Sequence, residues 1–126
     1  MSRRVLGLRE ITIDLNLFLH EAVCVIGSFK NLESYVRYQW EDPQASIEGT
    51  DSESQGLFMF RDGRASIIWL PERPVGARKI AALVHECMHM VHYLMKHRGM
   101  KLTDDTDELY SYTIMHAVYS VLKAFK

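Results

Sequence analysis

Two histidines four positions apart form the most informative pattern in this chain, in the run His85-Glu86-Cys87-Met88-His89. Residues with this spacing lie on one face of an α-helix, with Cβ atoms about 5–6 Å apart. Their imidazoles can therefore bind one zinc ion, at about 2.0–2.1 Å from each nitrogen. Glu86 lies about 100° round the helix from His85. We expect it to act as a general base on a water activated by the metal, rather than as a third ligand.

A catalytic zinc site also needs a third protein ligand and an open position for water. Glu108 is the preferred candidate, because it follows a turn signal at residues 99–101 and begins a helix that can fold back antiparallel onto the histidines. Asp104 and Asp107 compete with it for this role. The alternative for Glu108 is an exposed acid at a helix N-terminus, which the helix dipole favours.

Three further side chains near this pattern have more than one candidate role. His92 shares the face of His89, but it lies roughly 10 Å along the helix axis from His85, which makes it a residue of the cleft rim. Tyr112 and His116 follow Glu108 at four and eight positions. They could donate hydrogen bonds to an oxyanion near the metal, or they could pack as ordinary helix residues.

Two helices must position these groups. The first is predicted from about residue 76 or 77 to Arg98, and its apolar residues cover most of its circumference, which is typical of a buried central helix. Gly99 is a suitable stop after it. The second is predicted from an N-cap among residues 103–105 to about Ala124.

The first part of the chain predicts strands and a short helix. Alternating apolar and polar residues over Ile11–Leu19 indicate a half-buried strand, and Ala22–Ile26 is either a second strand or a bent continuation of the first. Apolar residues at helical spacing predict an amphipathic helix over Asn31–Trp40. Glu41–Gly56 is polar and is predicted to be an exposed loop.

A hairpin is predicted between this loop and the long helix. Apolar runs at Leu57–Phe60 and Ala65–Leu70 flank Asp62-Gly63, which favours a type I′ turn. Strands followed by helices indicate an α+β fold: a twisted sheet of three or four strands packed on the two helices. A chain of 126 residues is the size of a single domain, predicted here over residues 1–126.

Composition excludes several classes of protein. Fifteen Lys and Arg against 16 Asp and Glu give a net charge of -1, which argues against a nucleic-acid-binding surface. No apolar run approaches the roughly 20 residues of a membrane span. The basic start at Met1–Arg4 is not followed by an apolar signal core, so a cytoplasmic location is expected. Cys24 and Cys87 are too few for a disulfide framework and indicate buried thiols in a reducing compartment.

The run at residues 85–89, followed by Asp107-Glu108-Leu109-Tyr110-Ser111-Tyr112, resembles the gluzincin branch of the zincin metallopeptidases. The small size is similar to that of the minigluzincins and of short zinc-peptidase-like proteins of tailed bacteriophages. The resemblance covers about residues 57–126. It implies one zinc ion per chain, with the ligands His85, His89 and Glu108. It further implies that Glu86 is the catalytic base, and that a peptide or protein substrate pairs along an edge strand at Ala65–Leu70.

The chain departs from this family pattern at two points. Many gluzincins have an aspartate four residues after the ligand glutamate, where this chain has Tyr112. The sequence also holds no counterpart of the C-terminal subdomain that supplies oxyanion donors and specificity pockets in larger zincins. The motif makes a zinc peptidase the leading expectation. The missing subdomain favours the alternative, a catalytically silent zinc-binding module that binds a partner protein. A zinc hydrolase of non-peptide amides is a weaker third option.

Overall fold

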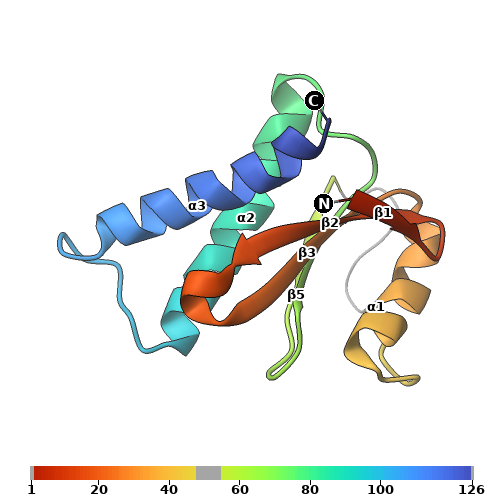
Figure 1. The fold of residues 1–126 in the computed structure, drawn as a ribbon, viewed down its shortest axis with the longest axis horizontal. Helices are drawn as coiled ribbons and strands as arrows, with labels where there is room; N and C mark the ends of the chain where they lie inside the picture. The colour runs from red at the N-terminus through yellow and green to blue at the C-terminus, as the bar shows by residue number, and fades with distance from the viewer. Residues whose placement is uncertain (1, 48–54, 126) are drawn as a thin grey trace.

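The computed structural model describes residues 2–47 and 55–125, which form a five-stranded mixed sheet with α-helices on both faces (Figure 1). The α+β class predicted from the sequence is confirmed, with five strands instead of three or four. The elements in chain order are β1 (Ser2–Val5), β2 (Leu8–Leu15), β3 (His20–Ile26), α1 (Leu32–Trp40), β4 (Leu57–Met59), β5 (Ser66–Leu70), α2 (Ala77–His97) and α3 (Asp107–Leu122).

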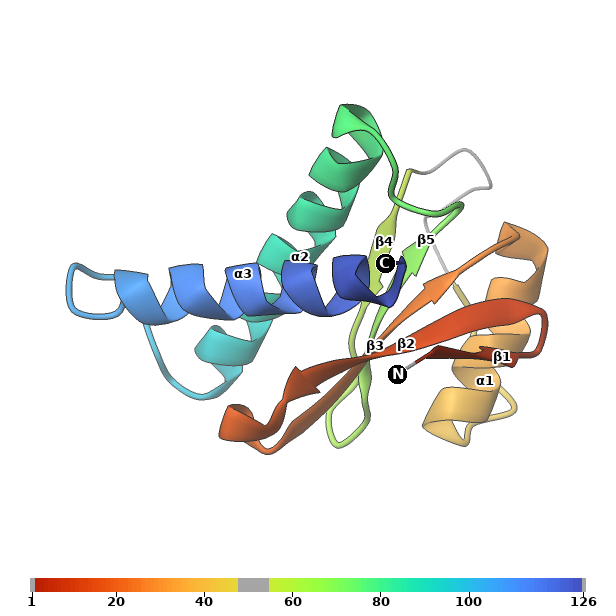
Figure 2. The same cartoon turned by 45° about the horizontal axis from the view of Figure 1, so that its top comes forward.

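Alternate residues of the central strands enter two separate cores. One face of the sheet packs on α2 and α3 and includes Cys24, Ile68 and Leu70. The other face packs on α1 and includes Val25 and Trp69. Figure 2 shows α2 and α3 on one side of the sheet and α1 on the other. Because both faces are covered, β3 and β5 are almost entirely apolar, as inner strands of this kind usually are.

The order of the strands is β1-β2-β3-β5-β4, with β3 and β5 parallel and the other pairs antiparallel. The prediction that Ala65–Leu70 forms an edge strand is therefore wrong. β5 lies between β3 and β4, with Val23 opposite Ile67 in the parallel ladder. Among the described strands, β4 is the edge on this side of the sheet. The sequence showed the local hairpin, but parallel pairing with a strand about 40 residues earlier leaves no local signal.

The hairpin between β4 and β5 also differs from its prediction. Met59 is opposite Ile67, so the connection is longer than a two-residue turn. Gly63 has a φ of 73°, whereas Asp62 does not have a positive φ, and a type I′ turn requires both. A positive φ at the second central residue alone is the pattern of a type II turn. Arg61 draws this loop toward the end of α1, where its guanidinium lies 2.6 Å from Asp42 Oδ2.

The N-terminal strands resolve one open alternative. Ala22–Ile26 belongs to a separate strand, β3, which pairs antiparallel with β2; the predicted strand over Ile11–Leu19 ends earlier, at Leu15. The polar strand β1 was not predicted, and it pairs with β2 through residues such as Arg3, which bonds Glu10 at 2.7 Å. The helix expected over Asn31–Trp40 is confirmed as α1. In the predicted loop Glu41–Gly56, residues 48–54 lie outside the described part, and Ala45 is buried rather than exposed.

The range predicted for α2 is confirmed to within a residue, whereas α3 begins later than predicted, because its N-cap is Thr106 and not one of residues 103–105. The predicted packing of the two helices is wrong. α2 ends at His97, and Gly99 follows with a φ of 76°, as expected for a stop. α2 is not buried all round: an exposed face carries His85, His89, His92 and Lys96. α3 crosses α2 rather than running antiparallel along it (Figures 1 and 2). No helix in residues 2–47 and 55–125 has both the length and the apolar character needed to cross a bilayer.

Candidate metal centre

His85 and His89 form a close pair on the exposed face of α2. Their Nε2 atoms lie 3.0 Å apart, and their ring planes are inclined at 87°. Two nitrogen ligands of a tetrahedral zinc ion, each at 2.0–2.1 Å, are about 3.3–3.4 Å apart. The 3.0 Å contact is a hydrogen bond between the two imidazoles, and this separation is close to that of two nitrogen ligands on one metal ion.

Glu86 lies beside this pair, but its side chain turns inward. The residue is only 8% exposed, and its carboxylate packs beneath Gly56, just before β4. A Cβ atom at Gly56 would lie 3.1 Å from Glu86 Cγ and 3.3 Å from its Oε2. Burial raises the pKa of the Glu86 carboxyl above its usual 4.5, and the two nearby imidazoles oppose this shift. A buried carboxylate with a raised pKa has the properties of a general base.

A cleft of about 760 Å³ opens next to His89, between α2 and β4. It is lined by Phe58, His89, His92, Tyr93, Lys96 and His97. An aromatic contact spans it: the rings of Phe58 on β4 and Tyr93 on α2 have centroids 6.1 Å apart. His92 lies on this rim, as the helical spacing predicted. The cleft therefore connects His89, one member of the histidine pair, with the edge strand β4.

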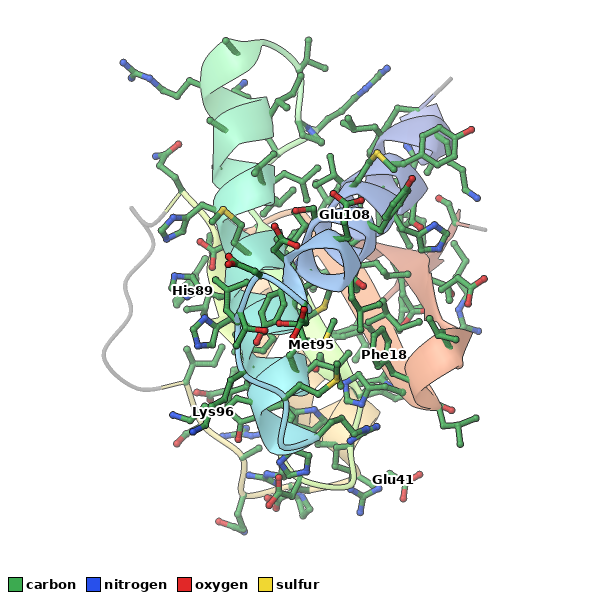
Figure 3. The ribbon with its side chains drawn as sticks, turned by 90° about the vertical axis from the view of Figure 1, so that its left-hand side faces the viewer. Phe18, Glu41, His89, Met95, Lys96 and Glu108 are labelled. Atoms are coloured by element: carbon green, nitrogen blue, oxygen red, sulfur yellow. The ribbon has the colours of Figure 1, made fainter. Side chains whose placement is uncertain are left out.

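Glu108 is not brought together with the histidine pair. Within residues 2–47 and 55–125, no three His, Cys, Asp or Glu side chains gather into a group that could hold a metal ion. Glu108 belongs to α3. In Figure 3 the side chain of His89 extends from the side of α2 that faces away from α3. Nine helical residues turn through about 900°, so Glu108 points away from Ala117, which is fully buried. Glu108 as the third zinc ligand therefore stays a prediction.

Asp107 has the more favourable direction of the two acids in the first turn of α3. It lies about 60° round the helix from Tyr110. The ring of Tyr110 faces α2, with its centroid 6.4 Å from that of His92. Asp107 is therefore on the side of α3 that is nearer to the histidines, although its side chain is exposed.

Tyr112 and His116 lie in a different hollow, of about 320 Å³, between α3 and the end of β2. Its other lining residues include Leu15 and Phe18. Both side chains are exposed, Tyr112 to 61%, and neither lines the cleft beside His89, so their roles at the metal stay predictions. This outcome follows from the crossing of α2 and α3, which carries the outer face of α3 away from α2.

The sequence interpretation missed Gly56 and the cleft residues Phe58 and Lys96. Lys96 follows His89 at seven positions, so the helical period could have placed it on the same face. Gly56 gave no such signal, because its role depends on the approach of two distant segments. Comparisons of the chain with protein-family models, with curated proteins and with solved structures find no match.

Proposed function

We propose that this chain is a zinc-dependent peptidase, with one zinc ion bound at His85 and His89 on α2. The observation that carries the proposal is the convergence of the two Nε2 atoms, 3.0 Å apart, beside the buried carboxylate of Glu86. Both imidazoles are exposed, and His89 lines a cleft large enough for a side chain. An ordinary surface helix has no need of a buried, desolvated glutamate at this position.

The residues present fit a zinc ion, because imidazole nitrogen is a preferred zinc ligand. When bound, zinc supplies a positive charge that polarises a carbonyl group and lowers the pKa of water. Glu86 accepts a proton from the attacking water and then delivers it to the leaving amine. Its burial beneath Gly56 fixes the carboxylate and raises its pKa, both of which favour proton transfer near neutral pH.

The third ligand comes, in this proposal, from the first turn of α3. Glu108 is the candidate from the family resemblance, and Asp107 is favoured by its direction on the helix. Zinc titrations of Glu108→Gln and Asp107→Asn distinguish them, because only loss of a true ligand lowers zinc affinity strongly. The two variants remove the same charge from the same helix turn, so each is the control for the other.

We place the substrate along β4, in an extended conformation, since Phe58 of this strand lines the cleft with His89. Addition of a peptide strand to a sheet edge supplies backbone hydrogen bonds, and adjacent pockets select the side chains. The cytoplasm is the proposed setting, supported by Cys24 and Cys87, which are both free and buried.

A zinc-binding module that binds a partner without cutting it is the second candidate. The observation that favours it is the outward direction of Glu108, opposite the buried Ala117. With only two protein ligands, the site would hold zinc more weakly and leave the metal open to a ligand from a partner protein. A zinc affinity that rises on addition of a partner would support this candidate.

Cleavage of a peptide library tests the peptidase proposal. Wild-type protein should cleave in the presence of zinc, stop with a chelator and recover when zinc is returned. Glu86→Gln should keep its zinc and lose cleavage, whereas Glu21→Gln, an exposed glutamate of β3, should behave as wild type. Cleavage by Glu86→Gln at the wild-type rate would show that the mechanism is wrong.

A further inference from the structure

The outer face of α3 is unusually apolar for a surface helix. Fourteen consecutive residues of α3, from Leu109 to Leu122, include no Asp, Glu, Lys or Arg. The cores account for most of this composition: Tyr110, Thr113, Ala117, Ser120 and Val121 are buried, and Leu109, Ile114, Val118 and Leu122 are partly buried against them. Exposed helix faces normally carry charged residues, so the remaining apolar side chains require a different explanation.

Three large side chains form a stripe along the exposed face, which we call the α3 stripe: Tyr112, Met115 and Tyr119. They are 61%, 59% and 53% exposed, respectively. Their spacing of three and four residues places them within an arc of about 60°. Such spacing is that of the contact line between two paired helices. Figure 2 shows α3 in front of α2 and the sheet, where a second helix can approach it.

The two ends of α3 carry opposite charges. Its first turn and the residues just before it are acidic: Asp104, Asp105, Asp107 and Glu108. Its far end is basic, since Lys123 follows the helix and two arginines lie close to Phe125. The Cζ atoms of Arg9 and Arg73 are 4.3 Å and 4.9 Å from the centroid of the Phe125 ring. A helix with an apolar middle and oppositely charged ends is complementary to an antiparallel copy of itself.

We propose that the α3 stripe is the contact surface of a symmetric dimer, in which α3 of two copies of this chain pair antiparallel. A two-fold axis between Met115 and His116 places Tyr112 opposite Tyr119 of the second copy. The same register places the acidic first turn beside Lys123 of the second copy. One surface thus serves both subunits, as two-fold symmetry requires. Asp107 or Glu108 of this turn is also the proposed third zinc ligand, so the pairing depends on the combined charge of the four acidic residues rather than on either of these two.

Sedimentation equilibrium of the full chain tests this proposal. Wild-type protein should be a dimer at micromolar concentrations, and Met115→Glu should weaken dimerisation about a hundredfold or more, because it places two carboxylates beside the axis. The matched control is Met88→Glu on α2, a methionine that is 52% exposed and lies outside the stripe. This control should dimerise as wild type. The proposal is overturned if the wild-type chain stays monomeric at every micromolar concentration measured. Binding of the monomer to lipid vesicles would assign the stripe to a membrane surface and would overturn it as well.

The antiparallel register has its own test, with two double variants. Tyr112→Glu with Tyr119→Lys should still dimerise, since each glutamate then faces a lysine of the other copy. Tyr112→Glu with Tyr119→Glu should be monomeric, since like charges face each other. Parallel pairing would make the first double variant monomeric, and that result would overturn the register. Circular dichroism checks that each variant is folded. If a variant is unfolded, the sedimentation equilibrium of the wild-type chain decides the proposal.

Discussion

Replacement of Glu86 by glutamine should stabilise the metal-free protein at neutral pH while removing its proposed activity. The side chain is 8% exposed, and burial raises the pKa of its carboxyl above 4.5 despite the two imidazoles beside it. Ionised Glu86 therefore costs free energy in the folded state that neutral glutamine, of nearly the same shape, does not. The variant should therefore unfold at a higher urea concentration than wild type at pH 7.

The pH dependence of this gain has a definite sign. Since the pKa of Glu86 is higher in the folded than in the unfolded protein, protonation stabilises the fold. Below pH 4.5 the carboxyl is neutral in both states, and wild type and Glu86→Gln should be similar. As the pH rises through the folded-state pKa, wild type loses this stability and the variant does not. The difference between them should therefore grow as the pH rises above 4.5 and level off above the folded-state pKa.

Urea unfolding in the presence of a chelator, at a series of pH values, measures this difference. Glu21→Gln is the control: its carboxylate is exposed, so its effect should stay within about 0.5 kcal/mol at every pH. A Glu86→Gln variant that is less stable than wild type at pH 7 would refute the reasoning. It would mean that ionised Glu86 stabilises the folded protein. Its burial would then not be a loss of stability that is retained because the residue has a function.

Three further changes test other parts of the structure. Gly56→Ala adds a Cβ atom 3.1 Å from Glu86 Cγ; it should cost about 1–3 kcal/mol in urea unfolding and reduce peptide cleavage, while calorimetric zinc affinity stays unchanged. Loss of zinc binding in this variant would contradict the role given to Gly56. Trp69→Ala removes a fully buried side chain between β5 and α1 and should cost about 3–5 kcal/mol in the same unfolding assay; a cost below about 1 kcal/mol would contradict the core assignment. Burial, with the nearby charges of Arg98 and His97, lowers the pKa of His20 below 6.5, so wild type should lose stability as the pH falls through this region. His20→Asn should reduce that loss in thermal unfolding at pH 5 to 7, and an unchanged pH profile would be the contrary result.

The local elements of this fold could be predicted from the sequence, because their signals are local. The apolar spacing before Gly99 located α2 to within a residue or two, and the apolar run around Trp69 located β5. The sequence could not show that β5 pairs parallel with β3, since that contact joins segments about 40 residues apart. The position of Ala65–Leu70 inside the sheet followed from this pairing and could not be foreseen.

The candidate site divides in the same way. His85 and His89 share a helix face by their spacing alone, and the structure brings their Nε2 atoms together. The third ligand depends on how α3 packs, and an antiparallel arrangement was expected where the structure has a crossing. The residue that covers Glu86 is Gly56, which lies 30 positions earlier, so only the folded chain reveals it.

The metal content of the purified protein tests the central claim most directly. Elemental mass spectrometry, on protein produced without added zinc, should find about one zinc per chain. The double variant His85→Ala with His89→Ala should contain none, and Met88→Ala, which changes an exposed neighbour on the same helix, should contain as much as wild type. Wild-type protein that contains no zinc and takes none up on incubation would contradict the account. The histidine pair would then be a surface feature without a metal.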